Sequence, residues 1–511
     1  MKKIFIIVSS ICLFYSAISL AAAPFNKPIT IGYYASWDAY NGFPPDKIPA
    51  ANLDVINYAF GAIDNNACEV KLLDPNIDEK NFAALQTLKN NNPHLKVLYS
   101  IGGWNNSNGF YYCTQSPEKT KVLANSIKNF LLNHPVLDGV DLDWEFPVAG
   151  GCNPAYETCR DSGQQHAPGD GDRKAFVDLV KEIRTAIGHD KYLTIAGPEV
   201  DGKTVMNSSI NNLDLKNMIP YLDFINIMAY DYHGAWETRT GNLAPLYRDA
   251  YQGEDAEHYN IDDAVNAYVK YGVPANKLVM GFPLYGLEWA NVADGGTHGL
   301  YQTATVIQNN HPLYKDIRTR DWNNVFQDKL SKSMMYFKDG IFTTFDGPET
   351  LKVKSRYIKD KKLLGAMFWE VSNDSCDKDA LIYQMSGALG RTGTKTYACP
   401  PPVPNNKLQV TVNGVTWLDA ITIVDGASYY PLQNGKHKDP NAWGPNDDVA
   451  FDRDSGPTIA NLEGKAGLKV QITRWGVSSM CKDGKDRAFN FTKYTHIQIN
   501  GDNLACQVDQ P

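Results

Sequence analysis

The chain alternates short apolar runs with amphipathic or charged stretches from residue 29 to about residue 390. Many of the stretches before the apolar runs read as helices, as Arg173–Arg184 does. Near-continuous apolar strands that alternate with helices predict a parallel sheet covered on both faces. The predicted strands are Thr30–Ser36, Val55–Gly61, Lys96–Ser100, Gly139–Glu145, Leu193–Gly197, Phe224–Tyr230, Leu278–Leu284 and Gly365–Trp369.

Eight such strands over about 360 residues predict an α/β fold, a (β/α)8 TIM barrel enlarged by insertions. The alternative is a doubly wound open sheet, but no GxGxxG or Walker loop follows an early strand. About 80 residues separate the last two predicted strands, too many for one crossover helix. We therefore expect an inserted α+β subdomain over about 288–345, which would wall one side of a cleft.

The pattern changes near the end of the chain. Residues 400–406, directly after Cys399, predict a short proline-rich linker. Beyond it the apolar positions have period two, as in Leu408/Val410/Val412 and Leu468/Val470/Ile472. This alternation between Gly, Asp and Asn turns predicts a separate all-β, sandwich-like domain over residues 407–511.

The first 21 residues predict a signal peptide. Lys2 and Lys3 form its charged start, residues 4–18 its apolar segment, and Ser19-Leu20-Ala21 a cleavage site. No later apolar run is long enough to cross a bilayer, so we expect a secreted, extracellular protein. A net charge of −8 and a pI near 5.7 argue against nucleic-acid or anionic-membrane partners.

Nine cysteines are present, and Cys12 leaves with the signal peptide. The even remainder of eight fits disulfides in an oxidising compartment, although eight cysteines allow 105 connectivities. No CxxC or Cys/His spacing is typical of a zinc site, and no metal is expected. Proximity along the chain favours Cys152–Cys159, Cys376–Cys399 and Cys481–Cys506, which leaves Cys68–Cys113.

Candidate chemistry concentrates in the fourth predicted strand. Asp141, Asp143 and Glu145 alternate with apolar residues, so a strand would project the three carboxyl groups from one face. A solvated acidic edge strand is the alternative, but the interleaved apolar residues and the following Phe146-Pro147 indicate burial. Because barrel enzymes place their chemistry at the C-terminal strand ends, the row predicts a glycosidase-type carboxylate cluster.

The segment Asp138–Glu145 resembles the DGxDxDxE signature of glycoside hydrolase family 18. Ser100–Gly103, Met228–Asp231 and Gly365–Glu370 resemble three further motifs of that family, in the same order. The insertion resembles the chitin-insertion domain of the chitinase-A-like bacterial branch. That branch often carries an Arg where this chain has Leu287, so a substrate contact made by the Arg is expected to be absent.

The resemblance implies a secreted chitinase that hydrolyses β-1,4 bonds between N-acetylglucosamine units. The catalytic domain would span residues 22–399 and act by a retaining, substrate-assisted mechanism without a cofactor. Glu145 would be the general acid and base, Asp143 would orient the acetamido group, Asp141 would share a proton with Asp143, and Tyr230 would hold the acetamido oxygen. Asp138 would be structural.

Further residues are expected to contact a chitin or chitooligosaccharide substrate. Met228 and Asp231 would shape the site of the sugar that is cleaved, and Trp369 would form its floor. Aromatic residues gather at the other strand ends and predict a cleft; those proposed to contact substrate are Tyr33, Phe60, Trp104, Trp236 and Tyr285, with Trp37 and Trp289 as further stacking candidates.

Two other functions stay open. One is an endo-β-N-acetylglucosaminidase acting on N-glycans, and the other is a chitinase-like lectin without activity, which the intact Glu145 disfavours. The β-rich domain is a candidate carbohydrate-binding module, in which Trp417, Trp443 and Trp475 would stack on sugars or pack in the core. We expect the protein to be a monomer.

Overall fold

The computed structural model divides the chain into two compact units, which are described separately. The first holds most of the chain up to residue 395, and the second holds residues 36–48, 376–378 and everything from residue 396. The structure describes Phe25, residues 27–40, 43–148, 171–202, 209–234, 236–249, 258–306 and 311–393, and the backbone of eight strands between residues 408 and 509.

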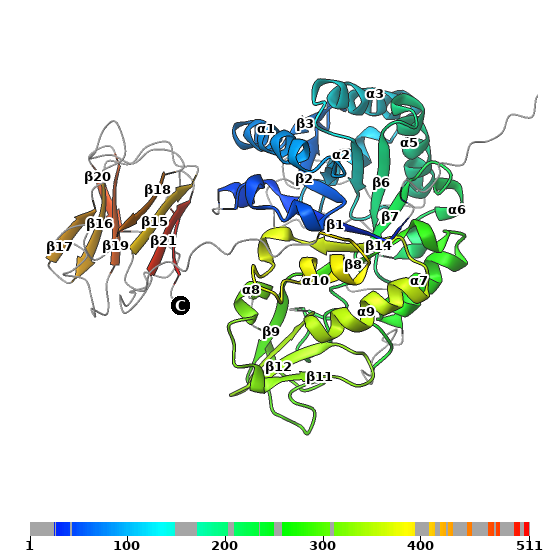
Figure 1. Ribbon diagram of the computed structural model, residues 1–511. Helices are drawn as coiled ribbons and strands as arrows, with labels where there is room; N and C mark the ends of the chain where they lie inside the picture. Colours follow the sequence, from blue (N-terminus) through cyan, green and yellow to red (C-terminus); the bar gives the residue numbers. More distant parts are fainter. Residues whose placement is uncertain are drawn as a thin grey trace, which may run out of the picture. The chain divides into compact units, whose positions relative to one another are not determined.

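The first unit is built on eight parallel strands that close into a barrel (Figure 1). Their order is β1-β14-β8-β7-β6-β5-β4-β2, and β1 pairs with β2 to complete the ring. The predicted (β/α)8 barrel is therefore confirmed. Its strands are β1 Ile29–Ala35, β2 Val55–Ile63, β4 Lys96–Gly102, β5 Gly139–Asp143, β6 Tyr192–Gly197, β7 Phe224–Ile227, β8 Leu278–Pro283 and β14 Gly365–Trp369.

Two predicted strands end two or more residues earlier than the apolar pattern indicates. β5 ends at Asp143, so Glu145 lies beyond the strand. β7 ends at Ile227 because two tight turns follow it, with Ala229 N–H bonded to the Ile227 carbonyl at 2.8 Å and Tyr230 N–H bonded to the Met228 carbonyl at 2.7 Å. Apolar residues continue past the ends of both strands because the segments that follow them are buried as well.

Helices cover the outside of the barrel (Figure 1). Three of them start with side-chain caps: Asp74 accepts from the N–H of Asn76, Ser116 from that of Lys119 and Asn260 from that of Asp263. The helices of the described residues are α1 Pro75–Asn91, α2 Asn108–Cys113, α3 Pro117–Asn133, α5 Gly171–Ile187, α6 Leu215–Met218, α7 Ile261–Lys270, α8 Tyr314–Ile317, α9 Pro348–Asp360 and α10 Leu381–Ala388.

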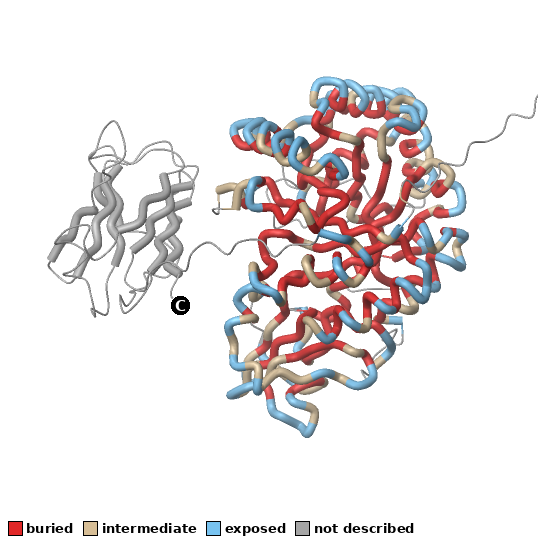
Figure 2. The backbone as a smooth tube through the Cα atoms, viewed as in Figure 1, coloured by how far each residue is buried: buried red, intermediate tan, exposed pale blue. Residues whose placement is uncertain are grey.

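Burial follows this layering (Figure 2). All seven residues of β1 and all nine of β2 are buried, as expected for strands that are covered on both faces. The helices bury one side only, as α3 does with Leu123, Ile127 and Phe130. The barrel interior is a packed core, so polar side chains in it need partners.

A second, antiparallel sheet lies between β8 and α9 in the chain, with strand order β10-β9-β13-β12-β11. It falls in the segment for which an insertion was predicted, although it starts slightly earlier. β9 pairs with β13, and β13 leads into α9. Its strands are β9 Gly286–Ala290, β10 Thr305–Val306, β11 Val325–Gln327, β12 Met334–Lys338 and β13 Ile341–Phe345, and the short β3 Val70–Leu72 joins the barrel sheet antiparallel to β2.

The C-terminal segment forms two four-stranded sheets, in agreement with the predicted all-β domain. Their orders are β18-β15-β21-β22 and β17-β16-β19-β20. The signal peptide, the linker and the three C-terminal tryptophans lie outside the described residues. The strands are β15 Leu408–Asn413, β16 Ala420–Asp425, β17 Ser428–Leu432, β18 Asp447–Phe451, β19 Lys469–Arg474, β20 Val477–Met480, β21 Thr495–Asn500 and β22 Ala505–Asp509.

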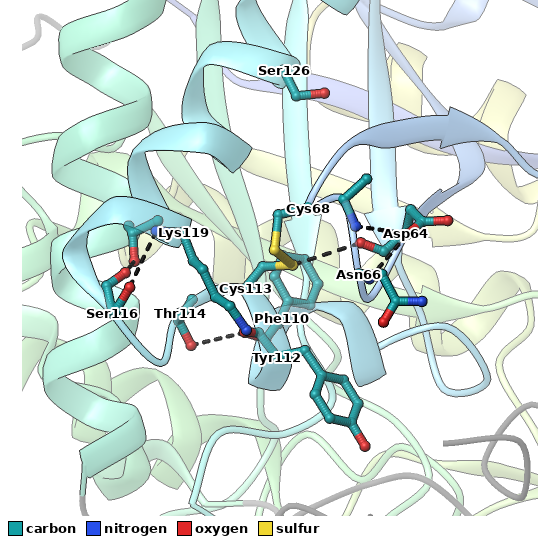
Figure 3. The surroundings of a disulfide bond; sticks show 12 residues. Asp64, Asn66, Cys68, Phe110, Tyr112, Cys113, Thr114, Ser116, Lys119 and Ser126 are labelled. Carbon is teal, nitrogen blue, oxygen red and sulfur yellow. Dashed lines mark hydrogen bonds between the residues drawn. A yellow bond between two sulfur atoms is a disulfide. The ribbon is translucent and has the colours of Figure 1, made fainter. Parts of the chain in front are cut away.

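One predicted disulfide is confirmed. Cys68 and Cys113 are bonded and connect the loop after β2 to the end of α2 (Figure 3). Cys376 is also in a disulfide, but Cys399, the partner predicted for it, lies outside the described residues. The other two predicted pairs involve cysteine side chains outside the described part of the chain.

Candidate active site

The acidic row passes from the barrel interior to its rim. Asp141 lies within β5, Asp143 is the last residue of that strand, and Glu145 follows two positions later. The carboxyl ends of the parallel strands meet at this face, where barrel enzymes carry their chemistry. Asp138, just before β5, accepts hydrogen bonds from Lys89 Nζ at 2.6 Å and Val97 N–H at 2.8 Å, a structural role as expected.

Asp141 is fully buried and is held by side chains from four other strands. Its Oδ2 accepts hydrogen bonds from the Tyr33 hydroxyl at 2.6 Å and Ser100 Oγ at 2.9 Å. Its Oδ1 accepts from Thr194 Oγ1 at 2.5 Å and Asn226 Nδ2 at 3.2 Å. Burial raises the pKa of Asp141, and these four hydrogen bonds oppose the rise because they favour the ionised carboxylate.

Asp143 differs from Asp141 in having an unsatisfied oxygen. Its side chain is buried, and its Oδ1 has no hydrogen-bond partner among the described residues. Burial raises the pKa of Asp143 well above its usual value, and the charges of Glu145 and Asp141 raise it further. With a raised pKa and a free oxygen, Asp143 is able to exchange a proton or to accept a hydrogen bond from a ligand.

Glu145 is partly exposed at the rim and is held by the loop after β4. Its N–H donates to Ser107 Oγ at 2.9 Å, and Ser107 in turn donates to the Asp143 carbonyl at 3.2 Å. Burial raises the pKa of Glu145 to about 8, helped by the charges of Glu199 and Asp231, while a backbone hydrogen bond from Trp104 opposes the rise. Glu145 can therefore hold a proton at neutral pH.

A second group of polar side chains follows β7. Tyr285 donates its hydroxyl hydrogen to Asp231 Oδ1 at 2.6 Å, and burial still raises the pKa of Asp231 to about 6. Tyr230 packs edge-on against Tyr285, with the ring centroids 6.3 Å apart. Met228 is partly exposed and packs on the barrel core. The turns after β7 thus bring these side chains close to the acidic row.

Trp369 lies at the end of β14 and is partly exposed. Its ring is 5.6 Å from that of Phe60 and 5.7 Å from that of Tyr33, centroid to centroid. Phe60 and Tyr33 are buried, so they support Trp369 and leave little of their own surface for a substrate. The bonds Ala59–Phe60, Glu145–Phe146 and Trp369–Glu370 are cis peptides.

The candidate stacking tryptophans divide into two groups. Trp37 and Trp236 are each 39% exposed, and Trp104 is partly exposed beside Glu145, so solvent reaches part of each of the three side chains. The prediction for Trp289 is wrong: its ring is fully buried in the core, and its Nε1 donates to the Glu237 carbonyl at 3.1 Å. Leu287, on the same strand, is buried as well and packs in the core.

Sequence analysis missed Glu199, which lies two residues beyond the end of β6. It is 3% exposed, its backbone carbonyl accepts from the Tyr232 hydroxyl at 3.0 Å, and its charge acts on Glu145. The available signal was an acid directly after the fifth predicted strand, the one strand end for which no residue was proposed. Ser107 was missed because a loop serine carries no signal of its own.

The described residues contain no cluster of three or more His, Cys, Asp or Glu side chains arranged to hold a metal ion. Within the same residues no helix is both long and apolar enough to span a membrane. The chemistry available is that of carboxyl groups with raised pKa values beside an aromatic floor.

The comparison with protein families matches residues 29–374 to the glycosyl hydrolases family 18. The chain belongs to that family. The match covers the whole barrel and the acidic row, and it confirms the resemblance carried by the four motifs. Every residue of the candidate site lies within the region that matches the family 18 model.

Characterised relatives support the same assignment. Chitinase A1 of Niallia circulans is 32% identical over 483 residues, covering 79% of this chain and 65% of that protein. Chitinase ChiA of Flavobacterium johnsoniae is 27% identical over 477 residues, covering 76% of this chain and 30% of that protein. The chain thus spans less than two thirds of the length of either relative.

A solved structure of the family has a similar fold. The group IV chitinase of Ostrinia furnacalis, solved in complex with allosamidin, superimposes with a TM-score of 0.61 at 25% identity. The superposition covers 71% of this chain and 98% of that one.

Proposed function

We propose that the protein is a secreted chitinase that hydrolyses β-1,4 bonds between N-acetylglucosamine units of chitin. The observation that carries this proposal is the combination of Glu145 at the rim, whose pKa is raised to about 8, with Asp143 behind it, whose Oδ1 has no partner among the described residues and whose pKa is raised as well. The names of the relatives support the substrate. Residues 22–399 would form the catalytic domain, and the β-rich domain would be an accessory.

Glu145 acts first as a general acid. A pKa of about 8 leaves the carboxyl group protonated near neutral pH, so it can donate a proton to the glycosidic oxygen of the leaving sugar. The carboxylate formed then removes a proton from the attacking water. Its backbone is held in place by Ser107, which limits the movement of the acid relative to Asp143.

The nucleophile is supplied by the substrate, as in the substrate-assisted exceptions among retaining glycosidases. The acetamido oxygen of the sugar attacks C1 and gives an oxazolinium ion. Asp143 accepts a hydrogen bond from the acetamido N–H through its free Oδ1, and it transfers its proton toward the buried Asp141 as positive charge develops. Asp141 lies two residues away on the same face of β5, and one of the four donors to its oxygens would turn away as it takes up that proton.

The remaining side chains position the sugar. Tyr230 would donate a hydrogen bond to the acetamido oxygen, and Asp231, held by Tyr285, would limit how Tyr230 and Met228 can move. Trp369 would stack under the sugar ring, supported from below by Phe60 and Tyr33. Cellulose lacks the acetamido group, so the mechanism predicts that it is not cleaved.

The test is the release of soluble oligosaccharides from colloidal chitin by the wild type and by Glu145→Gln. The variant keeps the size of the side chain but loses the titrating proton, so kcat should fall about 10²- to 10⁴-fold. Circular dichroism of the variant is the control for folding. Activity close to that of the wild type would exclude Glu145 as the acid.

Two further outcomes bear on the alternatives. Release of intact N-glycans from glycoprotein, with no product from chitin, would replace the chitinase by an endo-β-N-acetylglucosaminidase. A thiazoline analogue of N-acetylglucosamine resembles the cyclic intermediate and should inhibit competitively. If the analogue failed to inhibit an active enzyme, the substrate-assisted mechanism would be excluded.

A further inference from the structure

One layer of the barrel interior, at the level of Asp141, is largely polar. Asn57 on β2, Asp141 on β5, Asn226 on β7 and Met367 on β14 come from alternate strands of the ring, and we call these four side chains the Asp141 layer. Pairing through the strand between two neighbours always leads to a residue two positions before the next member of the set. This stagger places side chains in a common layer of a (β/α)8 barrel.

Both asparagine side chains point into the barrel. Asn226 donates from its Nδ2 to Asp141 Oδ1 at 3.2 Å. Asn57 is the register partner of Tyr33 in the pairing of β1 with β2, and side chains at paired positions lie on the same face of a sheet. Because the Tyr33 hydroxyl donates to Asp141 Oδ2, Asn57 faces the interior as well. Both asparagines are 0% exposed.

The two amides are not fully hydrogen-bonded within the protein. Asn57 Nδ2, Asn57 Oδ1 and Asn226 Oδ1 have no partner among the described residues. Asp141 does not supply one to Asn57, because each oxygen of Asp141 already accepts two hydrogen bonds. Met367 offers only a weak thioether acceptor. Buried amide groups without partners destabilise the fold, so a ligand that pairs with them is favoured.

The three atoms define the chemistry of that ligand, because one is a donor and two are acceptors. Water both donates and accepts, and a buried water typically makes about three hydrogen bonds to polar groups that are otherwise unsatisfied. A cation would leave Asn57 Nδ2 unpaired, and an anion would lie close to the Asp141 carboxylate. Water is therefore the ligand that matches all three atoms.

We propose that the Asp141 layer binds buried water between Asn57 and Asn226, and that Asn57 acts through this water as a positioning residue for Asp141. The water bonds to Asn226 Oδ1 and fixes the direction of the amide, so that Nδ2 stays directed at Asp141 Oδ1. The positioning role rests on the proposed chitinase mechanism, in which an ionised Asp141 receives a proton from Asp143. The water site itself does not depend on that mechanism.

The positioning role has a consequence for the pH dependence. The hydrogen bond from Asn226 lowers the pKa of Asp141 against the rise caused by burial. If the Asn226 amide loses its direction, the pKa of Asp141 rises, and Asp141 becomes protonated and unable to receive the proton at a higher pH. Tyr33 on β1 and Asp143 on β5 are the titrating groups that act on Asp141, while β4 and β6 contribute hydroxyl groups, β2 and β7 amides, and β14 a thioether.

The test compares Asn57→Ala with Asn57→Ser. The two replacements have nearly the same size and remove the same packing, but only serine keeps a group that donates and accepts a hydrogen bond. We measure kcat/KM on a soluble chitooligosaccharide as a function of pH for both variants and for the wild type. Circular dichroism is the control for folding. Other groups that titrate in the site, such as Asp231, do so in both variants, and their effect cancels in the ratio of the two kcat/KM values.

The ratio of kcat/KM in Asn57→Ala to that in Asn57→Ser should fall by about 3- to 10-fold as the pH is lowered, which corresponds to the loss of one hydrogen bond. KM should be equal in the two variants, because Asn57 is buried below the site and does not reach the substrate. A ratio that is the same at every pH would overturn the positioning role of Asn57 and leave the chitinase function standing.

A crystal structure of the wild type tests the water site independently of activity. Ordered solvent within hydrogen-bonding distance of Asn57 Nδ2 and Asn226 Oδ1 supports the site. Amides that bond directly to protein groups, with no solvent between them, overturn it. If the wild type failed to cleave chitin, the proposed function and the positioning role would fail together, and the crystal structure would still decide whether the Asp141 layer binds water.

Discussion

At the scale of single residues, the charges around Glu145 determine the pH range in which the site is active. The charges of two other carboxyl groups, Glu199 and Asp231, act on Glu145 here. Burial makes each charged form costly, and neighbouring negative charges add to that cost. The general acid therefore stays protonated to a higher pH than an exposed glutamic acid would.

The activity should depend on pH in the direction that follows from this shift. The acid must be protonated to act, so kcat/KM should fall as the pH rises through about 8. Glu199→Gln removes the neighbouring charge that raises the pKa of Glu145 most. The pKa of Glu145 should therefore fall, and kcat/KM should begin to decline at a lower pH. The measurement is the pH profile of kcat/KM on a soluble chitooligosaccharide.

A structural role for Glu199 alone would lower activity equally at every pH. A control is Glu237→Gln: the carboxylate of Glu237 interacts with His233, 2.9 Å away, and is not among the groups that raise the pKa of Glu145. If Glu199→Gln is folded and its kcat/KM declines at the same alkaline pH as that of the wild type, Glu199 and Glu145 are not electrostatically coupled.

At the scale of elements, the loops after β2 and β4 depend on one disulfide. Cys68 and Cys113 are 45 residues apart, so the bond closes a long loop of the unfolded chain. Replacing both by serine should lower the free energy of unfolding by about 2–4 kcal/mol, because the unfolded chain gains entropy. Urea denaturation under oxidising conditions measures this.

Reducing the wild type would also break the disulfide of Cys376, so the comparison for the double serine variant is the oxidised wild type. A variant as stable as the oxidised wild type would show that packing around Phe110 and Ile63 alone holds the two loops.

The strands themselves were predictable from the sequence, and their ends were not. The starts of β2, β4 and β5 fall where the apolar pattern places them, because strands covered on both faces are apolar throughout. The ends differ because the rim is buried by loops, so apolar character does not stop with the hydrogen-bond ladder. Glu145 and Tyr230 therefore looked like strand residues and lie beyond the strands.

At the scale of the whole molecule, the inserted sheet is joined to the barrel by a buried ion pair. Lys354 of α9 lies 2.6 Å from Asp346, which follows β13, and both side chains are almost completely buried. The Lys354 ammonium also lies 5.2 Å from the centre of the Phe282 ring on β8. The pair therefore links the sheet, the helix and the barrel.

Lys354→Met should lower the free energy of unfolding by about 3–5 kcal/mol, because Asp346 is left buried without its cation. The double variant Lys354→Met/Asp346→Leu removes both charges and should recover most of the loss. Thermal unfolding followed by circular dichroism gives both values. Equal destabilisation of the single and double variants would mean that packing, and not charge, carries the effect.

Long-range contacts set the limit of what the sequence could predict about the site. The acidic row, Tyr230 and Trp369 belong to local motifs, so the chain order alone identified them. Trp289 was misassigned because a tryptophan on an antiparallel strand has the same local pattern whether its face is covered or open. Glu199 carried only the signal of an acid after a predicted strand, because its effect on Glu145 arises when separate loops meet in space.

The four hydrogen bonds to Asp141 have a consequence for the choice of variants. A carboxylate offers two oxygens, and here each is occupied by two donors from different strands. An asparagine would offer one oxygen and one NH₂ group, so two of the four donors would face another donor inside the barrel. The customary Asp-to-Asn exchange would therefore disturb the register of four strands, and inactivity in such a variant would say nothing about proton transfer.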